Sequence, residues 1–316
     1  MPRPELSVII PVYYSAEIFP ELYRRVKETL DGASITFELL AIVDGCKDES
    51  ANVVASIHER DPRVKLVEFS RNFGEEAGVS AGLRHCEGEA AMVMDDDLED
   101  PPEIIPEFLA KLREGYDLVY GVIKKRKVSW FRRAAFYMYY RILNKLANLK
   151  MPADAGSLAI MRREVIDALN ELRESNLYIR GLRVWVGFKQ TGLEYDRHER
   201  YAGESAYNFR KYLQFAFNGI LSFSYKPLRL VTGTGLVVAL SSFLFTLWIL
   251  YQRLAGHLPD VPGYASMTVI VLFLGGAQLI AIGAVGEYIA RIYDETKRRP
   301  RYVIKRALGV EPKYRN

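Results

Sequence analysis

Three consecutive carboxylates, Asp95, Asp96 and Asp97, follow the apolar run Ala90–Met94, and Glu99 comes two residues later. Acids clustered at the end of a buried strand repel one another, and one tends to take up a proton unless a cation or solvent compensates the charge. Carboxylate oxygens are ligands that Mg²⁺ and Mn²⁺ prefer, and these ions in turn hold phosphate oxygens. The pattern favours a metal–diphosphate site. An acidic turn that opens a helix explains the same residues equally well.

The chain around these acids alternates short apolar runs with amphipathic stretches up to about residue 125. The spacing predicts strands over 6–12, 37–43, 64–69, 90–94 and 117–121, and helices over 18–30, 50–60, 77–85 and 102–114. Such alternation indicates an α/β fold with a largely parallel sheet and helices on both faces. Ligands of such sheets bind beyond the carboxyl ends of the strands. Asp44 and Asp95 both follow predicted strands, so we expect them to line one cleft.

The composition excludes several classes of protein. The 316 residues are 49% hydrophobic and 26% charged, which predicts a folded chain. A net charge of +4 does not argue for nucleic-acid binding. Cys46 and Cys86 form neither a metal-ligand spacing nor a disulfide framework, so a largely cytosolic chain with reduced thiols is expected.

Two long segments, Leu230–Tyr251 and Val261–Gly286, contain no Asp, Glu, Lys or Arg. Roughly 20 apolar residues, at about 1.5 Å rise each, cross a bilayer core of about 30 Å. Buried core helices are the alternative, but they are rarely this long and this free of charge. We predict two transmembrane helices, at about 230–251 and 267–289, in a region covering 230–290.

Basic residues flank this region on both sides, whereas the loop Gln252–Ser266 between the two segments carries only Arg253 and Asp260 among charged residues. Positive flanks stay on the cytosolic side. We therefore expect a multi-pass protein of the bacterial inner membrane, with both termini in the cytosol and with 291–316 as a basic tail along the leaflet. The flanking residues are Arg210, Lys211, Lys226, Arg229, Arg291, Lys297, Arg298, Arg299 and Arg301.

Basic and aromatic residues alternate around 129–150 and 207–226. Amphipathic helices of this kind favour an anionic membrane surface, and ordinary core packing of about half of the aromatic residues is the alternative. We expect both to be interfacial helices at the edge of a cytosolic domain that spans residues 1–229.

Short motifs recur in order along nearly the whole chain, and they resemble the polyprenyl-phosphate glycosyltransferases of glycosyltransferase family 2. That group includes dolichyl-phosphate mannose synthase, and the bacterial transferases of glucose or aminoarabinose to undecaprenyl phosphate look nearest. The motifs are Ser7–Tyr13, Asp44–Gly45, Ser70–Gly74, Asp95–Glu103, Gly115–Asp117, Arg180–Leu182, Trp185–Gly187, Ala202–Ser205 and Gly286–Tyr293.

The resemblance implies a GT-A fold, a nucleotide-sugar donor that is usually a UDP-sugar, and a Mg²⁺ or Mn²⁺ ion. It also implies a polyprenyl phosphate acceptor on the cytosolic leaflet, contact with membrane lipids, and transfer of one sugar with inversion at the anomeric carbon. The acceptor is a phosphate monoester with a second pKa of about 6, so it needs alignment more than activation. Glycine-rich spans and the nearest relatives favour a homotetramer.

The resemblance also implies a role for each residue that matches a family motif. Asp97 would be the metal ligand that catalysis requires, with Asp95 near the ribose or the metal and Glu99 in contact with the metal. The nucleotide would be bound by Pro11, Tyr13, Asp44 at the base, Arg71, Asp95, Asp96 and Arg200 at the diphosphate. The lipid phosphate would be bound by Lys124, Arg126 and Arg132, with Ser205 as a candidate at either phosphate.

The sequence departs from the family pattern around residue 157, where Ser157 stands at a position that many relatives fill with aspartate. The arabinose-type members place an acid earlier, in an Asp-x-Gly pattern that Asp154 and Gly156 match. We therefore expect Asp154 to be the catalytic acid near the acceptor. A helix cap or a turn residue is the alternative for Asp154.

Two other functions fit parts of the sequence. A processive polysaccharide synthase also combines such a domain with membrane helices, but the Q-x-x-R-W motif typical of that class is missing from the sequence. A non-catalytic membrane adaptor that keeps a nucleotide pocket would explain the altered positions Ser15, Val43 and Ser157. Turnover of a UDP-sugar with a lipid phosphate would separate the enzyme from the adaptor.

Overall fold

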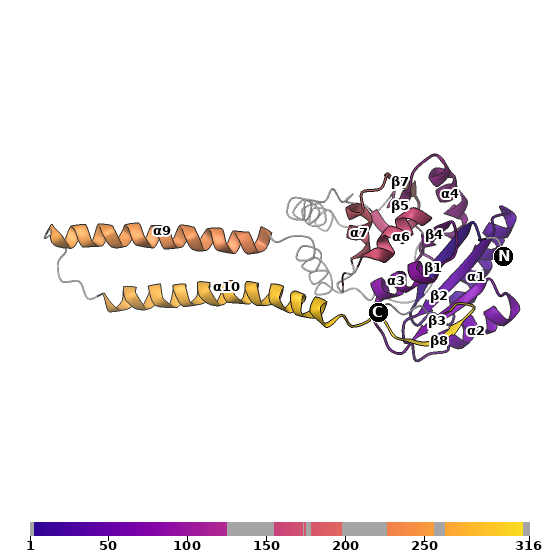
Figure 1. Ribbon diagram of the computed structural model, residues 1–316, viewed down its shortest axis with the longest axis horizontal. Helices are drawn as coiled ribbons and strands as arrows, with labels where there is room; N and C mark the ends of the chain where they lie inside the picture. The colour runs from indigo at the N-terminus through magenta and orange to yellow at the C-terminus, as the bar shows by residue number, and fades with distance from the viewer. Residues whose placement is uncertain are drawn as a thin grey trace.

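The computed structural model describes residues 3–124, 155–172, 174, 178–197, 226–255 and 263–311. Within these ranges an α/β body is built on an eight-stranded sheet in the order β7-β5-β6-β4-β1-β2-β3-β8 (Figure 1). The strands are β1 (Leu6–Val12), β2 (Phe37–Val43), β3 (Val64–Phe69), β4 (Ala90–Val93), β5 (Leu118–Ile123), β6 (Ala155–Arg162), β7 (Gln190–Tyr195) and β8 (Ile304–Leu308). The helices of the body are α1 (Phe19–Gly32), α2 (Ser50–Arg60), α3 (Glu75–His85), the 3-10 turn η1 (Pro102–Ile104), α4 (Ile105–Arg113), α6 (Arg163–Glu171) and α7 (Ile179–Trp185).

Four parallel strands form the centre of the sheet. β1 pairs with β2 from Leu6 opposite Phe37 to Val12 opposite Val43, and β1 pairs with β4 on its other side. Their side chains are buried on both faces, which explains the continuous apolar runs in the sequence. The predicted bounds of the first three strands are confirmed, and the fourth ends one residue earlier than predicted.

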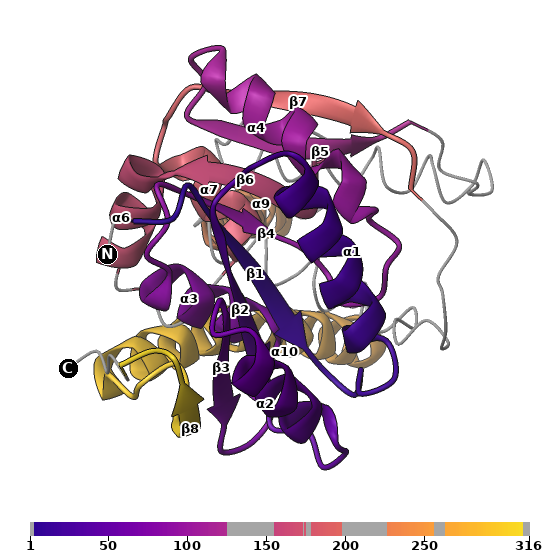
Figure 2. The ribbon, with the colours of Figure 1, turned by 90° about the vertical axis from the view of Figure 1, so that its right-hand side faces the viewer.

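Helices cover both faces of the sheet, as the predicted α/β GT-A fold requires (Figure 2). α1, α2 and α4 pack on one face, where Phe19, Leu22 and Phe108 are fully buried in one apolar cluster. α3, α6 and α7 pack on the other face around Ile9 and Val67. The sheet is mixed rather than purely parallel, because β6 runs antiparallel between β4 and β5, and β8 runs antiparallel to β3.

The segment predicted as a basic tail, 291–316, contains β8, which extends the sheet beyond β3. Tyr302, just before β8, is buried and stacks on Phe69 with ring centroids 4.9 Å apart. Arg301 donates to the Ser80 hydroxyl at 3.0 Å and to the Leu172 carbonyl at 2.7 Å. The sequence analysis did not predict this strand, and the position of the segment along the leaflet stays a prediction. An exposed lysine and an arginine in a short edge strand hid the strand pattern.

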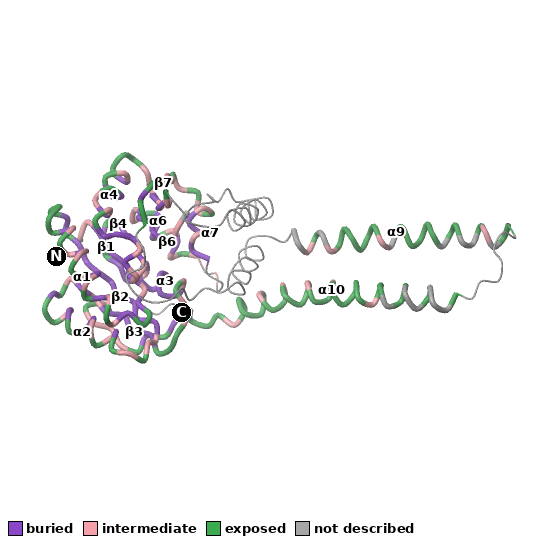
Figure 3. Tube along the Cα trace, turned by 180° about the vertical axis from the view of Figure 1, so that it is seen from behind, coloured by how far each residue is buried: buried purple, intermediate pink, exposed green. Residues whose placement is uncertain are grey.

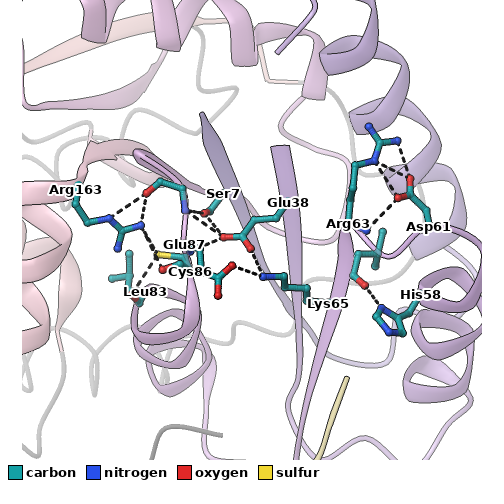
Figure 4. Close-up of polar contacts among 12 residues, drawn as sticks. Ser7, Glu38, His58, Asp61, Arg63, Lys65, Leu83, Cys86, Glu87 and Arg163 are labelled. Carbon is teal, nitrogen blue, oxygen red and sulfur yellow. Dashed lines mark hydrogen bonds and ion pairs between the residues drawn. The ribbon is translucent and has the colours of Figure 1, made fainter. Parts of the chain in front are cut away.

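A buried polar network fixes the amino ends of the central strands (Figure 4). The buried Glu38 carboxylate accepts a hydrogen bond from the Ser7 hydroxyl at 2.5 Å and pairs with Lys65 Nζ at 2.6 Å. The backbone N–H groups of Glu87 and Gly88 close the network on Glu38 and Ser7. These contacts hold β1, β2 and β3 in register at the edge opposite their carboxyl ends.

Two long helices, α9 (Lys226–Leu254) and α10 (Tyr264–Lys297), lie side by side and project from the α/β body (Figure 1). Most described residues along them are exposed, whereas buried residues gather in the body (Figure 3), and the exposed ones include large apolar residues such as Leu236 and Leu279. Within the described residues one helix segment, Phe273–Lys297, is long and apolar enough to cross a membrane, and a shorter apolar segment covers Val231–Phe245. The predicted spans 230–251 and 267–289 fall within α9 and α10.

Candidate functional site

The acidic cluster lies at the point where the strand order of the sheet reverses. β2 and β3 lie on one side of β1, whereas β4 lies on the other. The segments that follow β1 and β4 therefore diverge where they leave the carboxyl edge of the sheet. Ligands of open α/β sheets bind at such a switch point. Tyr13 follows β1, Asp44 follows β2, and Asp95, Asp96 and Asp97 follow β4 at this edge. The structure therefore places Tyr13, Asp44 and the three acids at the same edge of the sheet, and their joint role in a nucleotide cleft stays a prediction.

Asp96 joins the acidic segment to the loop after β1. Its Oδ2 accepts hydrogen bonds from the Tyr13 backbone N–H at 2.9 Å and from the Ser15 hydroxyl at 2.5 Å. Burial, with repulsion from Asp95 and Asp97, raises the pKa of Asp96 to about 6 although both hydrogen bonds oppose the shift. The Tyr13 ring is 53% exposed above this anchor, which leaves it open for contact with a ligand.

Asp95 is held from the opposite side by β6. The Ser157 hydroxyl donates to Asp95 Oδ2 at 2.9 Å. The buried Arg183 guanidinium donates to the backbone carbonyls of Gly156 at 3.0 Å and Ser157 at 3.3 Å. Burial, with repulsion from Arg180, lowers the pKa of Arg183 to about 10, well above neutral pH. Arg183 therefore fixes the strand end that orients Asp95.

The turn after Asp97 has a strained backbone. Asp97 Oδ1 accepts a hydrogen bond from the Glu99 backbone N–H at 3.1 Å. Leu98 between them is buried and has φ +58°, and Tyr14 on the facing loop has φ +57°. A residue other than glycine in this region costs about 1–3 kcal/mol and is typical of functional loops. Both loops that border the acids are thus held in conformations that their own residues disfavour.

Arg197, two residues after β7, lies among three carboxylates. Its guanidinium is 3.6 Å from Asp95, 3.0 Å from Glu99 and 3.1 Å from Asp100. Burial alone would lower the pKa of Arg197, but the three acids outweigh it and raise the pKa. Asp100 is buried and also accepts the Tyr195 hydroxyl at 2.6 Å, yet burial and Asp95 raise the pKa of Asp100 to about 6.

Asp44 supports a neighbouring loop. Its two carboxylate oxygens accept the backbone N–H groups of Phe73 at 2.6 Å and Gly74 at 2.8 Å, and the side chain is buried. Gly45 has φ +64°, and a Cβ there would lie 2.1 Å from the backbone of Arg71, so only glycine permits this approach. Arg71 is exposed and stacks over Phe73 at 4.6 Å. The structure thus gives Asp44 a positioning contact, while its contact with a base stays a prediction.

A second charged group borders Asp95 at the start of α3. Partial loss of hydration and repulsion from Asp95 and Glu76 raise the pKa of Glu75 to about 7, whereas Arg180 opposes the rise. Glu76 accepts the Ile179 backbone N–H at 3.0 Å at the start of α7. The motif around Arg180 therefore contributes charges beside the acidic edge, a role that the sequence analysis left unassigned.

The residues present fit a divalent cation held jointly with a diphosphate. Asp95 and Asp97 supply carboxylate oxygens, and Mg²⁺ typically takes one or two carboxylates and completes its shell with substrate phosphate and water. The crowded acids with raised pKa values also favour a cation nearby. Among the described residues no three Asp, Glu, His or Cys side chains converge as a complete ligand set. Glu99 forms an ion pair with Arg197, and its predicted contact with a metal stays a prediction.

Other predicted residues lie at the border of the site or outside the described residues. Pro11 is half-buried at the end of β1. Lys124, after β5, is exposed and lies 4.0 Å from Asp196. The predicted residues Arg126, Arg132, Asp154, Arg200 and Ser205, and the predicted interfacial helices 129–150 and 207–226, lie outside the described residues.

Sequence reasoning missed three polar residues that shape this edge: Ser15, Arg183 and Arg197. Ser15 and Ser157 were noted only as departures from a pattern. Arg183 lies within an apolar helix and Arg197 in a charged stretch, so neither carried a signal of its own. Their partners are 26 to 102 residues away in the chain, and only the folded sheet brings them together.

Comparison with known proteins gives a consistent result. The model of glycosyl transferase family 2 matches residues 7–169, and the model of the GtrB C-terminal hairpin matches 226–292. An uncharacterized glycosyltransferase of Bacillus subtilis is 41% identical over 98% of this chain and 96% of its own length. A prophage bactoprenol glucosyl transferase homolog of Escherichia coli is 38% identical over 96% of this chain and 99% of its own length.

A solved structure is also similar in its α/β part. A glucosyl-3-phosphoglycerate synthase from Mycobacterium tuberculosis aligns with a TM-score of 0.49 and 15% identity, over 69% of this chain and 76% of that chain.

Proposed function

Because the chain belongs to glycosyl transferase family 2, we propose that it moves one sugar from a nucleotide-sugar, most simply a UDP-sugar, to a polyprenyl phosphate. The observation that carries the proposal is the acidic edge, where Asp95 and Asp97 follow β4 beside the exposed Tyr13. Relatives that match nearly the whole chain are named bactoprenol glucosyl transferases, which supports a polyprenyl acceptor and makes glucose the first sugar to test.

In this proposal the donor lies across the switch point of the sheet. Tyr13, whose backbone N–H is anchored by Asp96, and Pro11 would contact the nucleoside, and Arg71 on the loop held by Asp44 would contact the nucleotide. Asp95 and Asp97 would hold a Mg²⁺ or Mn²⁺ ion against the diphosphate. The ion would stabilise the negative charge that develops on the departing nucleotide.

The transfer itself is a single displacement. An oxygen of the acceptor phosphate forms a bond to the anomeric carbon as the bond from that carbon to the donor diphosphate breaks, so the configuration inverts. The acceptor is already an anion near neutral pH, and the protein contributes mainly by aligning it. Asp154, Lys124, Arg126 and Arg132 are the proposed acceptor-side residues, and Arg200 and Ser205 are proposed at the phosphates.

The hairpin would place this chemistry at a membrane. Helix α9 has 29 residues and α10 has 34, enough to cross a bilayer core of about 30 Å. Leu236 and Leu279 on these helices are 71% and 72% exposed, which suits lipid contact. Because α10 continues into β8 of the sheet, the end of the hairpin lies at the α/β body, and basic residues there favour the cytosolic side. We propose that both helices span the inner membrane of a bacterium, at about 230–251 and 267–289.

The decisive experiment is transfer by the full-length protein in detergent or nanodiscs. Undecaprenyl phosphate would be incubated with UDP-glucose and a panel of other nucleotide-sugars, with Mg²⁺, Mn²⁺ or a chelator, and labelled lipid product would be extracted. We expect product with one or a few donors, and loss of product with chelator. Asp97→Asn should abolish turnover without unfolding the protein.

A matched control is Asp167→Asn. Asp167 is an exposed aspartate on α6, and it lies outside the acidic segment that follows β4 in the sequence. Its activity should equal that of the unsubstituted protein. No lipid product with any donor would overturn the proposed function and favour a nucleotide-binding adaptor. Retained activity of Asp97→Asn would overturn the metal assignment alone.

A further inference from the structure

We propose that Arg197 is an internal counter-ion that holds the acids of the sheet edge in the metal-free protein and yields Asp95 and Glu99 when a divalent cation binds. The inference rests on the proposed function, because it takes a cation at Asp95 and Asp97 as its premise. The Arg197 guanidinium contacts three carboxylates of the segment that follows β4.

One of the three contacts is an anchor. Asp100 is 1% exposed in its side chain, and its Oδ1 accepts both Arg197 Nε at 3.1 Å and the Tyr195 hydroxyl at 2.6 Å. A charged hydrogen bond shielded from water is stronger than an exposed one. Arg197 therefore stays attached to Asp100 when its other partners leave.

The other two contacts are easier to release. Glu99 lies 3.0 Å and Asp95 3.6 Å from the guanidinium, and their side chains are 17% and 25% exposed. A cation from solvent can reach these two carboxylates, whereas it cannot reach Asp100. The contact to Asp95 is the longest of the three, and Asp95 is also the acid that Ser157 orients toward the edge.

A divalent cation and Arg197 compete for the same oxygens. A guanidinium carries one charge spread over three nitrogens, whereas Mg²⁺ and Mn²⁺ carry two charges and approach carboxylate oxygens to about 2.0–2.2 Å. Contact with Asp95 is therefore electrostatically more favourable for the cation than for Arg197. The cation must first displace Arg197 from Asp95. Arg197 consequently lowers the affinity for free metal and keeps the acids from repelling one another while no metal is bound.

The test measures metal binding without turnover. Full-length protein in detergent would be titrated with Mn²⁺ alone, and free Mn²⁺ would be followed by electron paramagnetic resonance. Arg197→Gln should tighten Mn²⁺ binding by about tenfold, the effect of one ion pair worth about 1.4 kcal/mol. Arg197→Lys keeps the charge but cannot reach three acids at once, so it should give an intermediate affinity.

Thermal unfolding supplies a second measurement. Without metal, Arg197→Gln should unfold several degrees below the unsubstituted protein, because the acids then repel one another. Mn²⁺ should raise its midpoint more than that of the unsubstituted protein. Arg24→Gln is the matched control, since Arg24 also lies between two carboxylates, Glu21 and Glu28, but on the exposed face of α1. It should leave Mn²⁺ binding unchanged.

The outcomes separate this inference from the proposed function. If the unsubstituted protein binds Mn²⁺ and Arg197→Gln and Arg197→Lys bind it equally or more weakly, Arg197 does not compete with the metal and the inference is wrong. If Arg197→Gln binds Mn²⁺ and the unsubstituted protein does not, the inference holds in its strongest form. If none of them binds Mn²⁺ even with UDP present, both the metal site and the inference fall, while lipid product in the transfer assay would still support the function.

Discussion

The Ser157 hydroxyl donates a 2.9 Å hydrogen bond to Asp95, so the start of β6 is tied to the end of β4 across the sheet. An aspartate at position 157 would place a second carboxylate beside Asp95. Serine instead gives Asp95 a donor and leaves the edge with one negative charge fewer. Ser157 therefore sets both the hydrogen bonding and the local charge around Asp95.

Replacing Ser157 should weaken the enzyme without unfolding it. Ser157→Ala removes the donor to a charged acceptor, an interaction worth about 1.5–3 kcal/mol, so kcat/KM should fall by roughly tenfold or more. Ser157→Asp should lower kcat/KM further, because a second carboxylate beside Asp95 repels it. Steady-state transfer kinetics check both variants. Unchanged kinetics of Ser157→Ala would show that this hydrogen bond does not orient Asp95 for the reaction.

Arg183 should be required for stability. Arg183→Met removes the charged donor to the carbonyls of Gly156 and Ser157, and a hydrogen bond from a charged group is worth about 1.5–3 kcal/mol. We expect thermal denaturation to give a lower unfolding midpoint for Arg183→Met than for the unsubstituted protein. Arg183→Lys should have an intermediate midpoint. Arg60→Met, which alters an exposed arginine at the end of α2, is the control and should unfold like the unsubstituted protein. Equal midpoints for Arg183→Met and the control would contradict the role of Arg183.

The strand β8 should be needed for the α/β body as well as for its link to α10. Tyr302→Ala removes a buried ring that stacks on Phe69, and loss of a large buried side chain costs about 3–5 kcal/mol. Val303→Ala changes the adjacent residue, which is 42% exposed, and should cost little. Thermal unfolding of both variants gives the comparison. A Tyr302→Ala protein as stable as Val303→Ala would mean that β8 is dispensable.

The elements that the sequence predicted correctly are those whose pattern lies within a few neighbouring residues. β1, β2, β3 and α2 were predicted with the bounds that the structure has, because apolar runs and helical spacing are local patterns. β6, β7 and β8 were missed. β6 and β7 lie in the half of the domain where the strand–helix alternation breaks down, and β8 is a short edge strand after a long apolar helix.

The candidate site shows the same difference, because the positions of the acids were predictable and their hydrogen-bond partners were not. The acids after β4 and Tyr13 after β1 follow from the rule that strand ends gather ligands, and the structure places them on one edge. The partners of those acids could not be predicted, since Ser15, Ser157 and Arg197 reach them through a sheet order that no local pattern encodes. Asp44 is a further example: its position was predicted, but its hydrogen bonds from the Phe73 and Gly74 backbone N–H groups were not.

Acid should destabilise the protein partly through Asp61. Hydrogen bonds from Arg63 and Tyr23 lower the pKa of Asp61 to about 2 from 3.8 although burial opposes this. A depressed folded-state pKa adds stability that is present above about pH 4 and is lost as the pH falls toward 2, here roughly 2 kcal/mol. Asp61→Asn should therefore be less stable at pH 7 and lose less stability between pH 4 and 2. Denaturant unfolding at each pH, with Asp167→Asn as control, measures this; parallel curves for Asp61→Asn and the unsubstituted protein would refute it.

Asp154 gives the sharpest test of the acceptor side. In the sequence it comes directly before β6, three residues ahead of the Ser157 that contacts Asp95. If Asp154 acts on the acceptor, Asp154→Asn should lower kcat by roughly 100-fold, the scale of lost alignment or proton handling, and change the affinity for the UDP-sugar little. Single-turnover transfer gives the rate, and calorimetric titration with UDP gives donor affinity. An Asp154→Asn protein that binds donor weakly but keeps its rate at saturation would place Asp154 on the donor instead, and the acceptor would then have to be aligned by the basic residues alone.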